Sequence, residues 1–170
     1  HTPGDDLDVL VAMNPAALKV HLSDLQENGM VLVNTANFTK KNLGLAGYEN
    51  NPLEDDTLKH YRSIKVDMTK LVTSALSDSG LTPKLMARST NMFALGLLYW
   101  LYERDMDSSI NFITKKFAKK PEIIDANIKA LKTGYYYGET IEVIKTTYRI
   151  PKAKFNKGTY RNIMGNDATA

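Results

Sequence analysis

Two asparagines stand where ligands are usually bound in an open α/β sheet. Asn14 follows the apolar run Leu7 to Met13, and Asn34 follows the apolar run Met30 to Val33. Ligands of such sheets lie outside the carboxyl ends of the strands, and an amide side chain offers them both a donor and an acceptor. Both asparagines are therefore candidates for a ligand crevice, although Asn14 precedes Pro15 and also has the sequence context of a helix cap.

A second group of candidates begins the most apolar segment of the chain. Asn91 and Met92 start the run that ends at Leu101, and Arg88 lies just before them. The N-terminus of a buried helix favours an anion, and the arginine adds positive charge beside it. Asn91 can equally act only as a helix cap, and packing in the core is the simpler role for Met92.

Three consecutive tyrosines, Tyr135, Tyr136 and Tyr137, follow Gly134 at the end of a predicted helix. Three neighbours on a helix cannot all be buried on one face. Rings with a polar tip are common at protein interfaces. We expect a contact with a partner here, and exposure to solvent without a partner is the alternative.

The other reactive side chains predict no catalytic group and no metal site. Glu54, Asp55 and Asp56 could act as acid and base, but such a run is more often a solvated turn. The chain has no cysteine and only three histidines, which share no ligand spacing, so thiolate-held clusters and disulfides are excluded. The net charge of +3 does not indicate a nucleic-acid partner.

The elements that position these residues follow from the hydrophobic pattern. Buried strands are predicted at Leu7–Met13, Met30–Val33 and Tyr61–Asp67, with a helix between the first two that starts at Pro15 and continues to Asn28-Gly29. A strand–helix–strand unit with short loops indicates a parallel sheet. The predicted fold class is α/β, a Rossmann-like three-layer parallel sheet whose N-terminal strand or strands are missing.

A cluster of helices is predicted after the third strand. Helical periodicity and cap residues place its members at Thr69–Ser79, at Ser89–Tyr102, after a cap at Asp107, and from Pro121 to about Gly134.

Two segments lack such periodicity. The long loop Thr35 to Lys59 is either functional or a surface excursion with a short helix near Lys40. The stretch from Lys145 to Asn162 holds six basic residues and no acid, which indicates a linker or an extended arm. Its interleaved aromatic residues also resemble a tract for single-stranded nucleic acid, but we predict no nucleic-acid partner. No segment has the length of a membrane helix or the pattern of a signal peptide, so a cytoplasmic protein is expected.

Four stretches together resemble a known family. The chain is similar to the γ-type domain of 2-oxoacid:ferredoxin (acceptor) oxidoreductases, and most of all to the fused γ–α subunit of the 2-oxoglutarate type. The similarity runs from Leu7 to about Thr140 and rests on the stretches "DVLVAMNPAAL", "VLVNTANF", "NMFALGLLYWL" and "KKFAKKPEIIDANIKALKTGYYYGET". The final "RNIMGNDATA" resembles the opening of the α domain.

The resemblance implies a domain organisation. Residues 1–144 would be a γ-type domain truncated at its N-terminus, residues 145–160 a basic linker, and residues 161–170 the start of the α domain, which is associated with thiamine diphosphate. The chain would be a piece of a longer polypeptide. Because a sheet without its first strands exposes an apolar edge, marginal stability or self-association into a homo-oligomer is expected.

The resemblance also implies a function. The complex would oxidatively decarboxylate a 2-oxoacid, expected to be 2-oxoglutarate, to an acyl-CoA and pass electrons to ferredoxin. Thiamine diphosphate and iron–sulfur clusters belong to the complete complex and CoA is its substrate, while this chain alone binds no cofactor and has an accessory role. Its implied partners are the α domain of the same polypeptide, the β subunit and, through the complex, ferredoxin. The family's glycine-rich strand–turn–helix is absent.

The resemblance retains the candidate residues without making any of them catalytic. Those that match the family's segments at element ends, and are expected to face the crevice, are Asn14, Asn34, Asn91 and Met92. Gly165 and Asn166 match the entry to the α domain and are expected at an interface, together with the three tyrosines. The alternative function is a non-catalytic, Rossmann-like module for subunit interaction.

Overall fold

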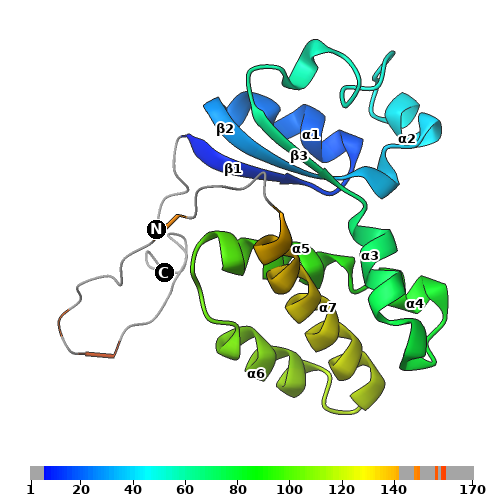
Figure 1. Cartoon of the computed structure of the whole chain (residues 1–170), viewed down its shortest axis with the longest axis vertical. Coiled ribbons are helices and arrows are strands. Elements are labelled where there is room, and N and C mark those ends of the chain that lie inside the picture. The colour runs from blue at the N-terminus through cyan, green and yellow to red at the C-terminus, as the bar shows by residue number, and fades with distance from the viewer. Residues whose placement is uncertain (1–5, 142–147, 150–155, 157, 160–170) are drawn as a thin grey trace, which may run out of the picture.

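The computed structural model describes residues 6–141, 148–149, 156 and 158–159. Its sheet has three parallel strands, β1 (Leu7–Ala12), β2 (Leu25–Asn34) and β3 (Arg62–Val66), in the order β1-β2-β3. Helices flank this sheet (Figure 1). The predicted α/β class and the parallel sheet are confirmed.

The two faces of the sheet belong to two separate hydrophobic clusters. Residues alternate between the faces of a strand, so Val31 and Val33 of β2 face one cluster, while Met30 and Leu32 face the other. The first cluster includes Leu18 of α1 (Pro15–His21) and is flanked by Leu43 of α2 (Lys40–Leu45). The second cluster continues into the helical part of the molecule. The fold thus has three layers: α1 with α2, the sheet, and the helical part.

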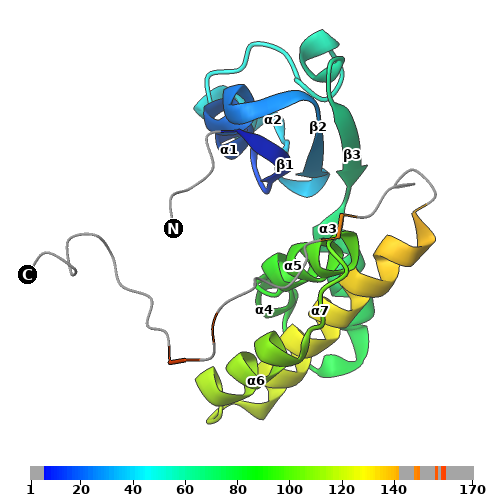
Figure 2. The ribbon, with the colours of Figure 1, turned by 90° about the vertical axis from the view of Figure 1, so that its left-hand side faces the viewer.

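The helical part lies beside the sheet and forms the lower half of the views in Figure 1 and Figure 2. It is made of the helices α3 (Met68–Ala75), α4 (Pro83–Ala87), α5 (Thr90–Leu101), α6 (Asp107–Lys116) and α7 (Pro121–Thr140). Short 3-10 turns lie at Leu22–Asp24, Thr35–Asn37, Asp56–Leu58 and Ser77–Ser79. The predicted C-terminal helical cluster is confirmed.

The second strand starts earlier than its sequence suggests. A helix was expected to continue to Asn28-Gly29, but α1 ends at His21 and Leu25 already pairs with Leu7 of β1. Leu25 is buried in the first cluster, and Asn28 takes a left-handed φ of +61° and donates its amide to the carbonyl of His60. The helical prediction was wrong because burial and strand pairing outweigh a leucine spacing over so short a segment.

The helical part differs from expectation at three helix ends. Helix α7 continues past Gly134 to Thr140, so the three tyrosines lie within it. Asp107 is the first residue of α6 rather than its cap, a position held by Met106. Ser89, not Asn91, precedes α5, and the short helix α4 lies where the sequence analysis predicts no helix.

Helices α5 and α7 pack with their backbones in contact. A Cβ atom on Gly96 would lie 1.9 Å from the carbonyl oxygen of Leu131, and one on Gly134 would lie 1.9 Å from that of Phe93. A Cβ on Gly138 would lie 2.4 Å from the ring of Trp100. Glycine is required here for close approach, because any side chain would push the two helices apart.

Asn34 ties the end of β2 to the start of α3. Its side chain is fully buried. The side-chain Oδ1 accepts a hydrogen bond from the amide of Met68 at 3.2 Å, and Nδ2 donates to the Thr69 hydroxyl at 3.2 Å. A buried amide with both ends bonded is a rigid link between the sheet and the helical part.

We predict that Gly134→Ala destabilises the fold. The new methyl group meets backbone atoms, which cannot rotate away as a side chain can, so the loss should be about 3 kcal/mol of unfolding free energy. The matched control is Gly44→Ala in α2, where nothing lies within 4 Å of the added Cβ. This control should be neutral or gain up to about 1 kcal/mol. Urea unfolding followed by circular dichroism measures both, and equal stability of the two variants would contradict the backbone contact.

We also predict that Asn34→Ala lowers stability. The substitution leaves the Met68 amide and the Thr69 hydroxyl without their partner, which costs about 1–3 kcal/mol. Asn91→Ala is the control, because Asn91 is exposed in the first turn of α5 and its loss should cost less than about 0.5 kcal/mol. Thermal unfolding of the two variants gives the comparison, and an unchanged midpoint for Asn34→Ala would argue against the link.

Candidate functional site

A hollow lies at the carboxyl ends of β1 and β2, where the sequence predicts a crevice. It encloses about 440 Å³ and is lined by Asn14, Pro15, Ala16, Asn37, Asn42, Leu45 and Ala46. Asn14 caps α1, since its Oδ1 accepts a hydrogen bond from the amide of Ala17 at 2.9 Å. The residue therefore combines the cap and the crevice position, which were the two alternatives for it.

Amides dominate the chemistry of this hollow. Asn37 donates through Nδ2 to the carbonyl of Met13 at 2.9 Å, and Asn42 donates through Nδ2 to the carbonyl of Asn37 at 2.9 Å. These bonds fix the side chains, and the lining residues carry no charge. The hollow can hydrogen-bond a neutral polar group, but it offers neither a nucleophile nor a general acid or base.

The other three crevice candidates do not gather at this hollow. Asn34 is buried and bonded inside the fold, Asn91 is exposed on α5, and Met92 packs against the second cluster. A role in binding stays a prediction for each of them.

The three tyrosines divide between core and surface. The ring of Tyr137 lies 5.4 Å from that of Phe93 and packs against the second cluster. Tyr136 is 55% exposed, and Tyr135 meets it edge to face at 5.6 Å. The ring of Tyr136 is thus available to a partner, while Tyr135 beside it is only partly exposed. Gly165 and Asn166, the other predicted interface residues, lie outside the described residues.

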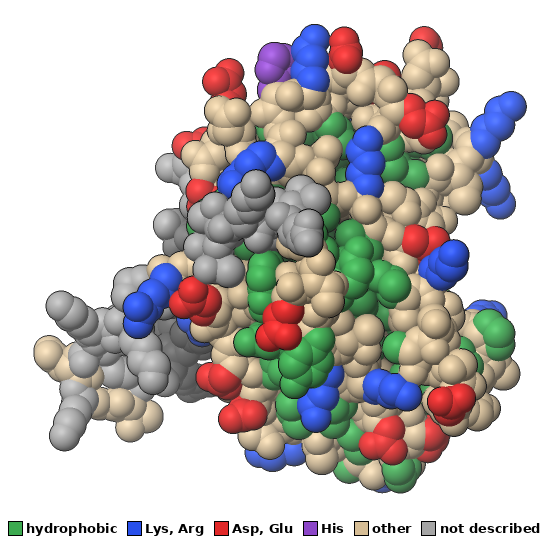
Figure 3. All heavy atoms as spheres, in the orientation of Figure 1, with side chains coloured by type: hydrophobic (Ala, Val, Ile, Leu, Met, Phe, Trp, Pro, Cys, Tyr) green, Lys and Arg blue, Asp and Glu red, His purple; other side chains and the backbone are tan. Residues whose placement is uncertain are grey.

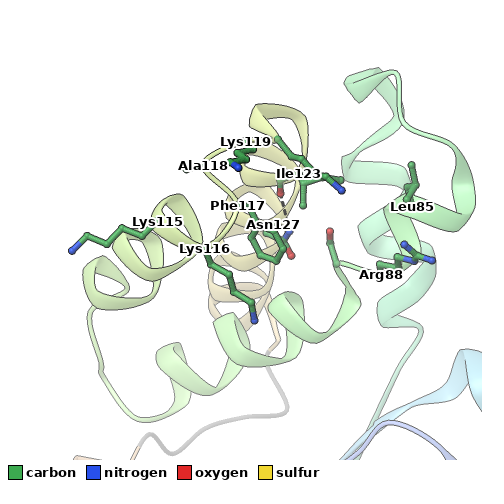
Figure 4. Close-up of a pocket in the computed structure, with 11 residues that line it drawn as sticks. Leu85, Arg88, Lys115, Lys116, Phe117, Ala118, Lys119, Ile123 and Asn127 are labelled. Carbon is green, nitrogen blue, oxygen red and sulfur yellow. Dashed lines mark hydrogen bonds between the residues drawn. The ribbon is translucent and has the colours of Figure 1, made fainter.

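A second and larger hollow lies among the helices, and we call it the cationic pocket (Figure 4). It encloses about 610 Å³ between α4, the start of α5 and the connection from α6 to α7. Its lining residues are Leu85, Arg88, Ser89, Lys115, Lys116, Phe117, Ala118, Lys119, Lys120, Ile123 and Asn127.

Sequence reasoning found only one part of this pocket. It placed an anion near Arg88 and missed the lysines of the stretch "KKFAKK", from Lys115 to Lys120. Four lysines in six residues around a predicted helix break were the available signal.

The pocket is positive, and none of its described lining residues is acidic. By contrast, Figure 3 shows basic and acidic side chains interspersed on the face that it views. Lys116 lies over the rings of Phe112 and Phe117, with Nζ 5.2 Å and 5.6 Å from their centres, a cation–π arrangement. In Figure 4, Phe117 and Asn127 lie centrally and Lys115 extends away from the other residues.

The carboxylates do not form a catalytic group. Asp55 caps a short turn, and hydrogen bonds from the side chain and backbone of Thr57 lower its pKa. The carboxylate is exposed, so it fits the solvated turn rather than acid–base chemistry. No three metal-ligating side chains gather in the part of the chain that the structure describes.

Tyr148, in the predicted basic linker, contacts the fold. The amide of Tyr148 donates to the carbonyl of Leu101 at 2.7 Å, and its ring stacks on Tyr102 at 5.3 Å. Arg62 of β3 donates to the Tyr148 hydroxyl at 2.6 Å. Burial is the main cause that raises the pKa of Tyr102, with Asp8 and Tyr148 adding to it. Among the described residues, no helix has the length and apolar content to cross a membrane.

Sequence comparison finds two curated relatives. The chain is 53% identical over 169 residues to the 2-oxoglutarate oxidoreductase subunit KorA of Mycobacterium tuberculosis, which covers 99% of this chain and 26% of that subunit. It is 25% identical over 135 residues to the indolepyruvate oxidoreductase subunit IorB of Archaeoglobus fulgidus, covering 78% of this chain and 64% of that one. The chain thus spans about a quarter of the first relative and under two thirds of the second.

Structural comparison finds the same fold in solved proteins. The 2-oxoglutarate:ferredoxin oxidoreductase of Magnetococcus marinus, solved with 2-oxoglutarate, coenzyme A and succinyl-CoA bound, superposes with a TM-score of 0.61 at 19% identity, over 90% of this chain and 23% of that one. The γ subunit of a keto/oxoacid ferredoxin oxidoreductase from Geobacter sulfurreducens gives a TM-score of 0.51 at 18% identity, over 79% and 65%.

A family model for pyruvate ferredoxin/flavodoxin oxidoreductases matches residues 1–137. This match covers most of the chain and agrees with the resemblance in the four sequence stretches. The chain belongs to the pyruvate ferredoxin/flavodoxin oxidoreductase family.

Proposed function

We propose that this chain is the γ-type part of a 2-oxoglutarate:ferredoxin oxidoreductase, within a fused γ–α subunit. The observation that carries the proposal is the 53% identity to the KorA subunit over 99% of this chain. The complex would convert 2-oxoglutarate and CoA to an acyl-CoA and pass the electrons to ferredoxin. In this proposal residues 1–144 form the γ-type domain, 145–160 the basic linker and 161–170 the start of the α domain, in a cytoplasmic enzyme.

The residues of this chain do not fit either the iron–sulfur clusters or the thiamine diphosphate of such a complex. It has no cysteine to hold an iron–sulfur cluster. Its described part gathers no acidic or histidine ligands for the metal ion that a diphosphate cofactor requires. We therefore assign thiamine diphosphate and the clusters to other parts of the complex, and an accessory role to this chain.

In this proposal the chain supplies surfaces for binding a polar ligand and a neighbouring subunit. The hollow at Asn14 presents fixed amides at the carboxyl edge of the sheet, the usual binding edge of such folds. The exposed Tyr136, with the partly exposed Tyr135 against it, offers an aromatic contact for the α domain or the β subunit.

The proposed activity is tested on the assembled complex that contains this chain. We expect reduction of ferredoxin, or of a low-potential dye, that requires both 2-oxoglutarate and CoA. Pyruvate and indolepyruvate in place of 2-oxoglutarate are the controls for substrate class. The proposal would be overturned if a fully loaded complex oxidised none of the three acids in a CoA-dependent reaction.

A second candidate function is a non-catalytic module for subunit interaction, favoured by the exposure of Tyr136. We predict that Tyr136→Ala weakens association with the other subunits about tenfold, as expected for a buried aromatic interface residue. Turnover per assembled complex should not change. Val20→Ala is the control, because Val20 is 65% exposed on α1. Size-exclusion chromatography and analytical ultracentrifugation measure assembly, and equal assembly of the two variants would exclude Tyr136 from the interface.

A further inference from the structure

We propose that a docking surface on the γ-type part holds Tyr148 and thereby fixes the place where the chain leaves this part of the subunit. The surface, which we call the tyrosine seat, consists of Asn28 in β2, Arg62 at the start of β3, and Leu101 and Tyr102 at the end of α5. Its occupant belongs to the segment that leads toward the α domain, so the inference rests on the proposed fused γ–α organisation. In this role Tyr148 is a positioning residue.

Tyr148 is held at three points. Its backbone amide donates to the carbonyl of Leu101 at 2.7 Å, which fixes the main chain. Its ring stacks on the ring of Tyr102, with centres 5.3 Å apart and planes 27° apart, and it packs against the second cluster. Its hydroxyl accepts a hydrogen bond from Nη2 of Arg62 at 2.6 Å, and a charged donor makes such a bond stronger. The seat therefore recognises a main-chain amide, an aromatic ring and a hydroxyl together, which is the chemistry of a tyrosine.

A bulge in β2 orients the arginine of the seat. The five positions of Leu25–Met30 face only the two positions of Leu7–Val9 on β1, so β2 carries three extra residues here. Among them Asn28 takes its left-handed conformation and donates its amide to the carbonyl of His60. The Asn28 carbonyl accepts a hydrogen bond from Nε of Arg62 at 3.1 Å. Bulges commonly redirect side chains beside functional positions, and this one holds one side of the guanidinium while the other side bonds Tyr148.

The seat lies away from both hollows. Arg62 pairs with Met30 where the regular part of the β2–β3 ladder begins, so it is at the amino edge of the sheet, whereas the hollow at Asn14 is at the carboxyl edge. Leu101 is the last residue of α5, and the cationic pocket lies at the first turn of that helix. The seat therefore places the exit of the chain at the amino edge of the sheet, and Tyr148 covers neither hollow.

Incidental packing of a surface tyrosine explains only part of these contacts. The hydrogen bond between Arg62 and Tyr148 joins exposed groups, and one such bond contributes little to stability by itself. Incidental packing does not explain why the main chain and the ring of Tyr148 are held as well. It also does not explain why Arg62 is already bonded through its Nε.

The test is hydrogen exchange at the Tyr148 amide of the complete subunit in its complex, measured by mass spectrometry with fragmentation to single residues. The parent amide should exchange about a hundredfold more slowly than in an unstructured peptide of the same sequence, because it is bonded to Leu101. Tyr148→Phe removes only the hydroxyl, and Arg62→Gln removes its donor. Each should speed the exchange about tenfold, the effect of one charge-assisted hydrogen bond.

A double variant tests whether the two groups act through one contact. Arg62→Gln with Tyr148→Phe should exchange no faster than either single variant, because both remove the same bond. Arg149→Gln is the matched control, since it removes an exposed charge from the neighbouring residue and should leave the exchange unchanged. Unchanged exchange in α5 and α7 shows that each variant is folded.

Three results would each overturn the proposal: an unprotected Tyr148 amide in the parent, additive effects in the double variant, or equal exchange in Tyr148→Phe and Arg149→Gln. Trypsin cleavage after Lys152 should follow the same order among the variants, because cleavage tracks the opening of the seat. Neither measurement needs a substrate. Their results are therefore separate from whether the complex oxidises 2-oxoglutarate, which tests the proposed function.

Discussion

The contact between the backbones of α5 and α7 is the constraint on which the helical part depends. Gly96 and Gly134 allow carbonyl groups to approach where any Cβ would collide, so the two helices lock at one distance and one register. The apolar side of α5, including Phe93 and Leu97, is then held within the second cluster. The same contact sets how far Ser89, at the start of α5, lies from Asn127 of α7. The packing of α5 against α7 thus determines both the arrangement of the helical part and the shape of the cationic pocket.

Asn34 makes a comparable link on the side of the sheet. Hydrophobic burial alone would leave the direction of α3 loosely determined, because burial is not directional. The buried amide bonds both the backbone and a side chain of the first turn of α3, which fixes that direction. A residue that looks like a ligand-binding asparagine in the sequence is thus fully bonded within the fold. Asn14 differs, because capping α1 occupies its Oδ1 and still leaves the side chain at the rim of a hollow.

The distribution of polar groups suggests a division of work within the proposed complex. The hollow at the carboxyl edge of the sheet is neutral and rich in amides, whereas the pocket among the helices is positive and partly apolar. The described lining of both contains no carboxylate, histidine or cysteine, and no metal-binding cluster lies in the described part of the chain. In the proposed complex, such surfaces would bind and position polar ligands or neighbouring subunits. This is consistent with an accessory part of an oxidoreductase.

The sequence by itself determined the buried strands, the parallel sheet, the apolar helix α5 and the family, because these depend on local periodicity and on long matching stretches. It determined the cap at Asn14 for the same reason. Only the tertiary structure decided where β2 begins, since Leu25 joins the sheet through pairing with Leu7 against its own helical spacing. The tertiary structure also gathered the cationic pocket from segments far apart in the sequence. Tertiary packing, not local preference, decides where β2 begins and which distant segments line the pocket, so local sequence patterns do not predict either.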